Sequence, residues 1–255
     1  MRYLGAFLAL CFMALPLSAQ VWEVYDHFDG PLNPALWFTE YGEDRSALEY
    51  GRQIRNGYLE LLMRSYGRTD FNDGKTQAQN MMAIVDWTSF KGMKVQLTVT
   101  KAMIDDALGG QSGILIRASF YNSGSGEPID DVGANIGISA PETNSQTLSV
   151  GGEVVCGAVP GGLGGAVLGS IKIGEPVYIW VRWDTQVKKF FFGLQSLRRN
   201  QPPVEQGVAC ALLDVSPPVD HVYPMIGLSS WLSNSMTYQA SSELMVKIDQ
   251  VSVLR

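Results

Sequence analysis

Hydrophobic and polar residues alternate along most of the chain, and the spacing of an amphipathic helix is nearly absent. The segment "MKVQLTVTK" places Val95, Leu97 and Val99 on one face and mostly polar residues on the other. Such alternation is typical of a β-strand with one buried face. About a dozen segments of this kind follow one another, separated by turn residues. The pattern therefore predicts an antiparallel all-β sandwich or barrel.

Two local features refine this pattern. Asn56-Gly57 stands between two strand-like runs in "IRNGYLELLMR", and this dipeptide favours the positive φ angles of a tight hairpin turn. Near the C-terminus, "LMVKIDQVSVL" alternates in two parts that Asp249-Gln250 puts out of phase. This shift predicts a β-bulge in the last strand.

Residues 1–19 have the features of a secretory signal peptide. Arg2 precedes the apolar run "LGAFLALCFMALPL", and Ala19 provides the small residue at the predicted cleavage site. We therefore expect residues 20–255 to form a single domain that is secreted or periplasmic. A lipoprotein attached through Cys11 is the alternative, although Leu10 is larger than the residue that such a signal places before its cysteine.

Charge and hydropathy narrow the set of partners. The formal net charge is −6, and no run of basic residues is longer than two, as at Arg198-Arg199. Phosphate binding needs a concentrated basic face, so the composition argues against a nucleic-acid partner. After the leader, no segment approaches the roughly 18 apolar residues of a membrane-spanning helix.

Removal of the leader would leave two cysteines, Cys156 and Cys210. A pair of cysteines in an oxidising compartment predicts a disulfide, with two buried free thiols as the alternative.

The order of several motifs resembles the concanavalin A-like lectin/glucanase superfamily, in particular bacterial jelly rolls similar to laminin G domains. The motifs are "FDGPLNPALW", "GRQIRNGYLELLMR", "SGILIRASF", "PVYIWVRWD" and the closing "VKIDQVSVL". The resemblance covers nearly all of the chain after the leader and implies a two-sheet antiparallel jelly-roll sandwich. It also implies that "VWEVYDHF" pairs with the last strand. The residues that follow predict a sharp exit from this strand, because Gly30 has a permissive backbone and Pro31 and Pro34 fix φ and end the ladder, and we expect Trp37 to re-enter the core.

The enzyme motifs of this superfamily are not found in the sequence. Lichenase-like members carry Glu-x-Asp-x-(x)-Glu on one strand, which places the carboxylates for glycoside hydrolysis on one face. No Glu here has an Asp two residues further on. Neither His27 nor His221 lies in the Gln-Ile/Val-His motif of alginate-lyase jelly rolls. We therefore favour a non-catalytic or divergent member, while the question of enzymatic activity stays open.

Aromatic and polar side chains follow one face of several predicted strands. In "VYIWVRW", Tyr178, Trp180 and Arg182 lie opposite an apolar face. The order of strands in the superfamily implies that this strand lies near "SGILIRASFY" and "DVGANIG". We therefore expect a shallow ligand-binding groove lined by Arg117, Tyr121, Asn135, Trp180 and Arg182. The alternative for Trp180 is that a loop or a neighbouring strand covers it.

These features favour a secreted carbohydrate-binding or adhesion-type module whose partner is a polysaccharide or other glycan. The alternative is a glycan-active hydrolase with a divergent active site on the concave sheet, and a structural protein of the cell envelope is a third candidate.

The resemblance also implies a calcium site. Glucanase-like members often hold a metal through backbone oxygens near the first strand and an Asp of the last strand. The matching groups here are Asp29, Gly30 and Asp249, and oxygen ligands of this kind suit Ca²⁺. The alternative is that Asp249 caps a turn or pairs with a surface cation.

Overall fold

The computed structural model describes residues 21–40, 47–66, 75–86, 90–106, 109–120, 132–140, 145–156, 163–209, 224–233, 235, 237 and 239–255. The predicted leader, Tyr121, Cys210 and His221 lie outside these residues. The backbones of Arg117 and Cys156 are described, but their side chains are not.

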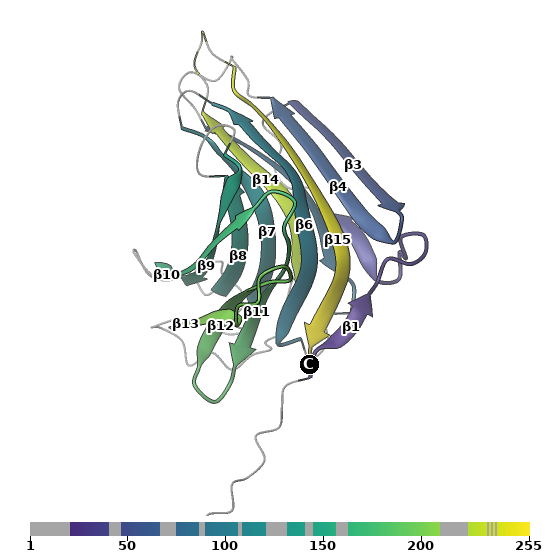
Figure 1. Cartoon of the computed structure of the whole chain (residues 1–255), viewed down its shortest axis with the longest axis vertical. Helices are drawn as coiled ribbons and strands as arrows, with labels where there is room; N and C mark the ends of the chain where they lie inside the picture. The colour runs from purple at the N-terminus through teal and green to yellow at the C-terminus, as the bar shows by residue number, and fades with distance from the viewer. Residues whose placement is uncertain are drawn as a thin grey trace, which may run out of the picture.

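Two antiparallel sheets pack face to face, which confirms the predicted all-β sandwich (Figure 1). Sheet A has the order β13 (Val204–Ala209), β12 (Lys189–Ser196), β11 (Pro176–Asp184), β6 (Gly92–Asp105), β15 (Ser241–Leu254), β4 (Tyr58–Tyr66) and β3 (Ala47–Arg55), with β1 (Glu23–Asp26) also paired to β15. Sheet B has the order β10 (Leu163–Lys172), β9 (Thr147–Cys156), β8 (Val132–Ala140), β7 (Gln111–Phe120), β14 (Met225–Ser233), β5 (Lys75–Ile84) and β2 (Trp37–Glu40). Within the described residues, no helix is long and apolar enough to cross a membrane.

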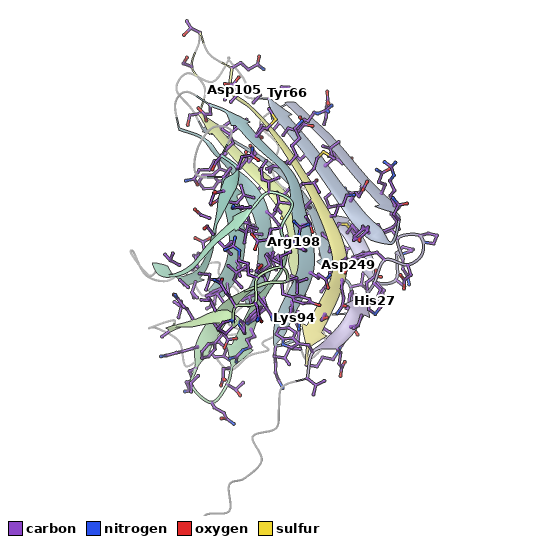
Figure 2. The ribbon with its side chains drawn as sticks, viewed as in Figure 1. His27, Tyr66, Lys94, Asp105, Arg198 and Asp249 are labelled. Atoms are coloured by element: carbon purple, nitrogen blue, oxygen red, sulfur yellow. The ribbon has the colours of Figure 1, made fainter. Side chains whose placement is uncertain are left out.

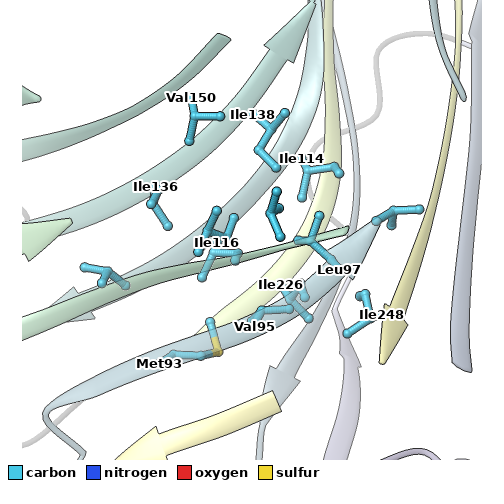
Figure 3. Packing of buried hydrophobic residues seen from close by; sticks show 14 of the residues in the cluster. Met93, Val95, Leu97, Ile114, Ile116, Ile136, Ile138, Val150, Ile226 and Ile248 are labelled. Atoms are coloured by element: carbon cyan, nitrogen blue, oxygen red, sulfur yellow. The ribbon is translucent and has the colours of Figure 1, made fainter. Parts of the chain in front are cut away.

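The inward faces of the two sheets form one hydrophobic core. Val95, Leu97 and Val99 of β6 are at most 2% exposed, as their alternation predicts. They belong to the same cluster as Ile114 of β7 and Ile136 of β8, and Figure 3 shows side chains from both sheets meeting in this layer. Full burial of each such side chain contributes about 1.5–3 kcal/mol. The core thus uses the inward faces of the sheets, and side chains on the outward faces can take part in binding.

The two predicted turn and bulge features are confirmed. Asn56 and Gly57 have φ angles of 53° and 75°, and they join β3 to β4 in a two-residue hairpin. The pairing of β15 with β6 shifts register between Ile248 and Gln250, where Asp249 interrupts the alternation. The first and last strands lie side by side as predicted, with Glu23 opposite Val253.

The segment after β1 carries the chain from sheet A to sheet B. Asp26 ends β1, and its carboxylate accepts hydrogen bonds from the Phe28 amide (2.8 Å) and from the indole nitrogen of Trp37 (2.7 Å). The Phe28 and Trp37 rings stack with their centroids 5.9 Å apart, and both side chains are buried. The predicted return of Trp37 to the core is therefore confirmed, and Asp26 fixes the geometry of this crossing.

The sandwich is curved. In Figure 1 the long strands β6 and β15 bend along their length, and β7, β8 and β9 lie on the inner side of the bend. The outward face of sheet B is therefore the concave face of the molecule.

Candidate functional site

The concave face has a floor of small residues across four neighbouring strands. Ser229 of β14 lies opposite Gly113 of β7, which lies opposite Ser139 of β8. One row further along, Gly137 of β8 lies opposite Gly151 of β9. Together these positions line a hollow of about 560 Å³, which we call the trough.

The glycines of the trough have different reasons for being small. A Cβ atom added to Gly113 would lie 2.3 Å from the Ile138 carbonyl oxygen, so the backbone of the neighbouring strand excludes any side chain there. A Cβ atom added to Gly137 would lie 3.5 Å from the Ile114 oxygen, an ordinary contact distance. Packing therefore requires glycine at residue 113, whereas at residue 137 a side chain fits and would point into the trough.

One end of the trough carries an exposed tryptophan. Trp231 of β14 is 50% exposed, and its cross-strand partner is Gln111 of β7. On the same strand Ile226, Leu228 and Leu232 point into the core and are fully buried. The indole face is thus held by a rigid strand and is available to a ligand.

The other end carries a polar row. Asn135 of β8 lies between Arg117 of β7 and Glu153 of β9 in the strand register. The Asn135 amide donates a hydrogen bond of 3.1 Å to the Glu153 carboxylate. Its Oδ1 atom is buried and has no hydrogen-bond partner among the described residues. Such an acceptor is costly unless water or a ligand supplies a donor.

The structure separates the residues of the predicted groove. Arg117 and Asn135 lie on sheet B, whereas Trp180 and Arg182 lie on β11 of sheet A, between β6 and β12. Tyr121 falls outside the described residues. The prediction of one groove shared by these residues is therefore wrong, because β11 is not a neighbour of β7 or β8 within a sheet.

Trp180 is covered, which agrees with the alternative reading of its strand. It is 8% exposed and lies across Gly193, its partner on β12. Its indole nitrogen donates a hydrogen bond of 2.7 Å to Glu205 of the edge strand β13. The polar group of the side chain is thus satisfied within sheet A.

Arg182 is held by neighbours in the same way. Its guanidinium donates to Glu205 at 3.1 and 2.7 Å and to Asp184 at 3.3 Å, and it lies over the Phe191 ring at 4.2 Å. Burial opposes the charged form, but the two carboxylates outweigh it and raise the pKa of Arg182 above its ordinary value. Its hydrogen-bonding capacity is largely used inside the protein.

The residues of the predicted calcium site lie in neighbouring segments. Asp26 is opposite Val251, so Asp249 lies beside the segment that follows β1, and Figure 2 shows His27 and Asp249 on that side of the sandwich. Asp29 and Gly30 are exposed, and Asp249 is half-buried. Among the described residues no three His, Cys, Asp or Glu side chains gather as metal ligands. The site would thus rely on backbone oxygens, and it stays a prediction.

The disulfide also stays a prediction. The backbone of Cys156 ends β9 opposite Val132, but its side chain and all of Cys210 fall outside the described residues.

Sequence reasoning missed Trp231 and Glu153. In "MIGLSSWLS" the apolar face is Ile226, Leu228 and Leu232, so the alternation alone places Trp231 on the outward face. In "TLSVGGEVV" the same argument places Glu153 on the outward face, because the next residue, Val154, lies on the buried face. Alternation places Trp231, Glu153 and Trp180 alike on outward faces and does not distinguish the open side chains from the covered one.

Comparisons with known proteins find similar structures but no similar sequences. No family model and no curated protein matches the chain. Among solved structures, it is similar to a glycoside hydrolase family protein from Mycobacterium thermorestibile, with 15% identity, a TM-score of 0.51, and coverage of 90% of this chain and 98% of that one. A putative beta-glucanase from Mycobacterium abscessus gives 12% identity, a TM-score of 0.51, and coverage of 89% and 97%. A pseudo beta-1,3-glucanase of Mycobacterium tuberculosis gives 14% identity, a TM-score of 0.49, and coverage of 90% of this chain and 96% of that one.

At these identities the likeness concerns the fold. The chain has the concanavalin A-like jelly-roll fold that the order of its motifs predicts.

Proposed function

We propose that this protein is an exported carbohydrate-binding module that holds a glycan in the trough of sheet B. The observation that carries the proposal is Trp231, a half-exposed indole at one end of a floor of glycine and serine residues. Large aromatic side chains usually bury their area, so an indole left open beside a hollow favours a ligand that packs on it. Export rests on the predicted leader.

The shape and chemistry of the trough suit a sugar chain. Its floor crosses four strands, which spans about 14 Å at the usual strand spacing. Small side chains allow flat rings to approach the backbone closely. Ser139, Ser229, Asn135 and Glu153 offer hydrogen-bonding groups for hydroxyls along the same hollow. The indole face at one end suits the apolar C–H face of a sugar ring, and the polar groups along the rest of the trough suit the sugar hydroxyls.

The proposal is tested by retention on polysaccharides. Purified protein is run through native gels that contain a neutral β-glucan, xylan, a polyuronate or a sulfated polysaccharide. At least one of them should retard it, and Trp231→Ala should weaken that retention about ten-fold or more. Tyr50→Ala on β3 of sheet A is the matched control, because it removes a similarly exposed aromatic (46%) far from the trough. It should leave retention unchanged.

Two outcomes count against the proposal. Equal retention of the wild type and Trp231→Ala would place binding elsewhere. Release of reducing ends from the same polysaccharides would favour the hydrolase alternative, which needs a second carboxylate beside Glu153.

A further inference from the structure

A second hollow lies at the edge of the sandwich, where sheet B passes into sheet A. It has a volume of about 520 Å³ and is lined by Thr147, Ser170, Lys172, Arg198 and Arg199. Thr147 and Lys172 are cross-strand partners on β9 and β10, and Arg198 and Arg199 follow β12. Arg198 is labelled in Figure 2. Basic side chains from two distant parts of the chain therefore meet in one hollow.

A buried carboxylate fixes this arrangement. Glu175 is 5% exposed, and its carboxylate accepts hydrogen bonds from the Ser196 hydroxyl (2.5 Å), the Lys172 amide (3.0 Å) and the Arg199 guanidinium (2.7 Å). Burial alone would raise the pKa of Glu175, but these three donors outweigh it and lower the pKa below its ordinary value. The Ser196 hydroxyl in turn accepts from the Arg198 amide at 3.3 Å. The ionised Glu175 carboxylate, with its hydrogen bonds satisfied inside the protein, thus fixes the backbone of Lys172 and the side chain of Arg199, and through Ser196 the backbone of Arg198.

The hollow keeps an excess of positive charge. Glu175 neutralises Arg199, but no carboxylate of the described residues lies within ion-pair distance of Lys172 or Arg198. Both side chains are exposed. This local excess of positive charge contrasts with the net charge of −6 of the chain as a whole.

The strand register connects this basic hollow to the trough. Ser139, which lines the trough, is opposite Ser149, and Ser149 is opposite Ser170, which lines the basic hollow. Two strand spacings separate the ends of this row, or about 10 Å. All three serines are on the outward face, so one extended ligand can reach from the trough to the basic hollow.

We propose that Lys172 and Arg198 bind an acidic group, a carboxylate or a sulfate ester, on a glycan that lies in the trough. The inference rests on the proposed function and gives its ligand class: an acidic polysaccharide. Arg199 positions the site through Glu175. Guanidinium and ammonium groups bind carboxylate and sulfate oxygens through charge-assisted hydrogen bonds, and the Thr147 and Ser170 hydroxyls can add further contacts.

The test compares three polysaccharides, polygalacturonate, dextran sulfate and neutral dextran, in native affinity gels. Lys172→Gln/Arg198→Gln should lose about ten-fold or more of the retention on whichever acidic polymer binds, and retention should fall as salt rises. Which of the two polymers is retained distinguishes a carboxylate from a sulfate. Arg55→Gln/Lys189→Gln is the matched control, because it removes two exposed charges outside sheet B and should change nothing.

The outcomes separate this inference from the proposed function. Unchanged retention of Lys172→Gln/Arg198→Gln on both acidic polymers would overturn the acidic subsite, even if Trp231→Ala still abolishes binding of a neutral glycan. Acidic retention that depends on Lys172 and Arg198 but not on Trp231 would support the basic hollow and contradict the trough.

Discussion

At the scale of single residues, two tryptophans on outward strand faces have opposite environments. Trp180 lies across Gly193 and donates to Glu205, and a Cβ atom on Gly193 would be 1.8 Å from its ring. Trp231 stands beside glycines and serines with half of its surface exposed. The difference lies in the neighbours: a third strand, β13, supplies a carboxylate and cover for the first indole.

Trp180→Ala should therefore destabilise the protein. The substitution leaves a cavity over Gly193 and removes one donor to Glu205, and we expect a loss of about 3–5 kcal/mol in the free energy of unfolding. Denaturant titration measures the loss, with Trp231→Ala as the comparison that should lie within about 1 kcal/mol of wild type. If Trp180→Ala proves as stable as Trp231→Ala, its structural role is refuted.

Alternation in the sequence predicts which side chains point outward but not which of them are covered. It assigned Val95, Leu97 and Val99 to the core correctly. It also placed Trp180 and Arg182 on an outward face, but it held no information about Glu205, which comes from a strand 23 or more residues away. Whether an outward side chain is covered depends on its tertiary neighbours, so alternation alone could not predict the exposed fraction of Trp180.

At the scale of elements, the last strand was predictable because its alternation changes phase at one point. Asp249-Gln250 marks the bulge in the sequence, and the register of β15 with β6 shifts there. The hairpin at Asn56-Gly57 was predictable for a similar reason, since few residues adopt two successive positive φ angles.

Calcium binding at the end of β1 is a prediction that melting curves can test. If backbone oxygens near Asp29 and Gly30 and the Asp249 carboxylate hold Ca²⁺, millimolar Ca²⁺ should raise the melting temperature relative to excess EDTA, because the ion binds the folded state alone. Each 1 kcal/mol of binding should shift the midpoint by about 2–4 °C. Asp249→Asn should abolish the shift. Superimposable melting curves in the two buffers would end the calcium hypothesis and leave the pairing of β1 with β15 intact.

At the scale of the whole molecule, the order of the strands predicted the sandwich but not the composition of its sheets. The chain leaves sheet A after β6, builds β7 to β10 in sheet B, and returns to sheet A at β11. Hydrophobic and polar residues alternate in the same way in the strands of both sheets, so the sequence does not indicate where the chain passes from one sheet to the other. The predicted groove failed for this reason, whereas Asn135 and the position of Arg117 remain on the concave face.

The trough can be blocked without disturbing the fold, which gives the most direct test of glycan binding there. Gly137→Thr should fold normally, because its Cβ atom has room and a β-branched residue suits a strand. Gly51→Thr on β3 is the matched control, since its Cβ atom would lie 3.8 Å from Leu62. Retention on the polysaccharide that retards the wild type should be lost in Gly137→Thr and kept in Gly51→Thr. Full retention by a folded Gly137→Thr variant would contradict binding in the trough.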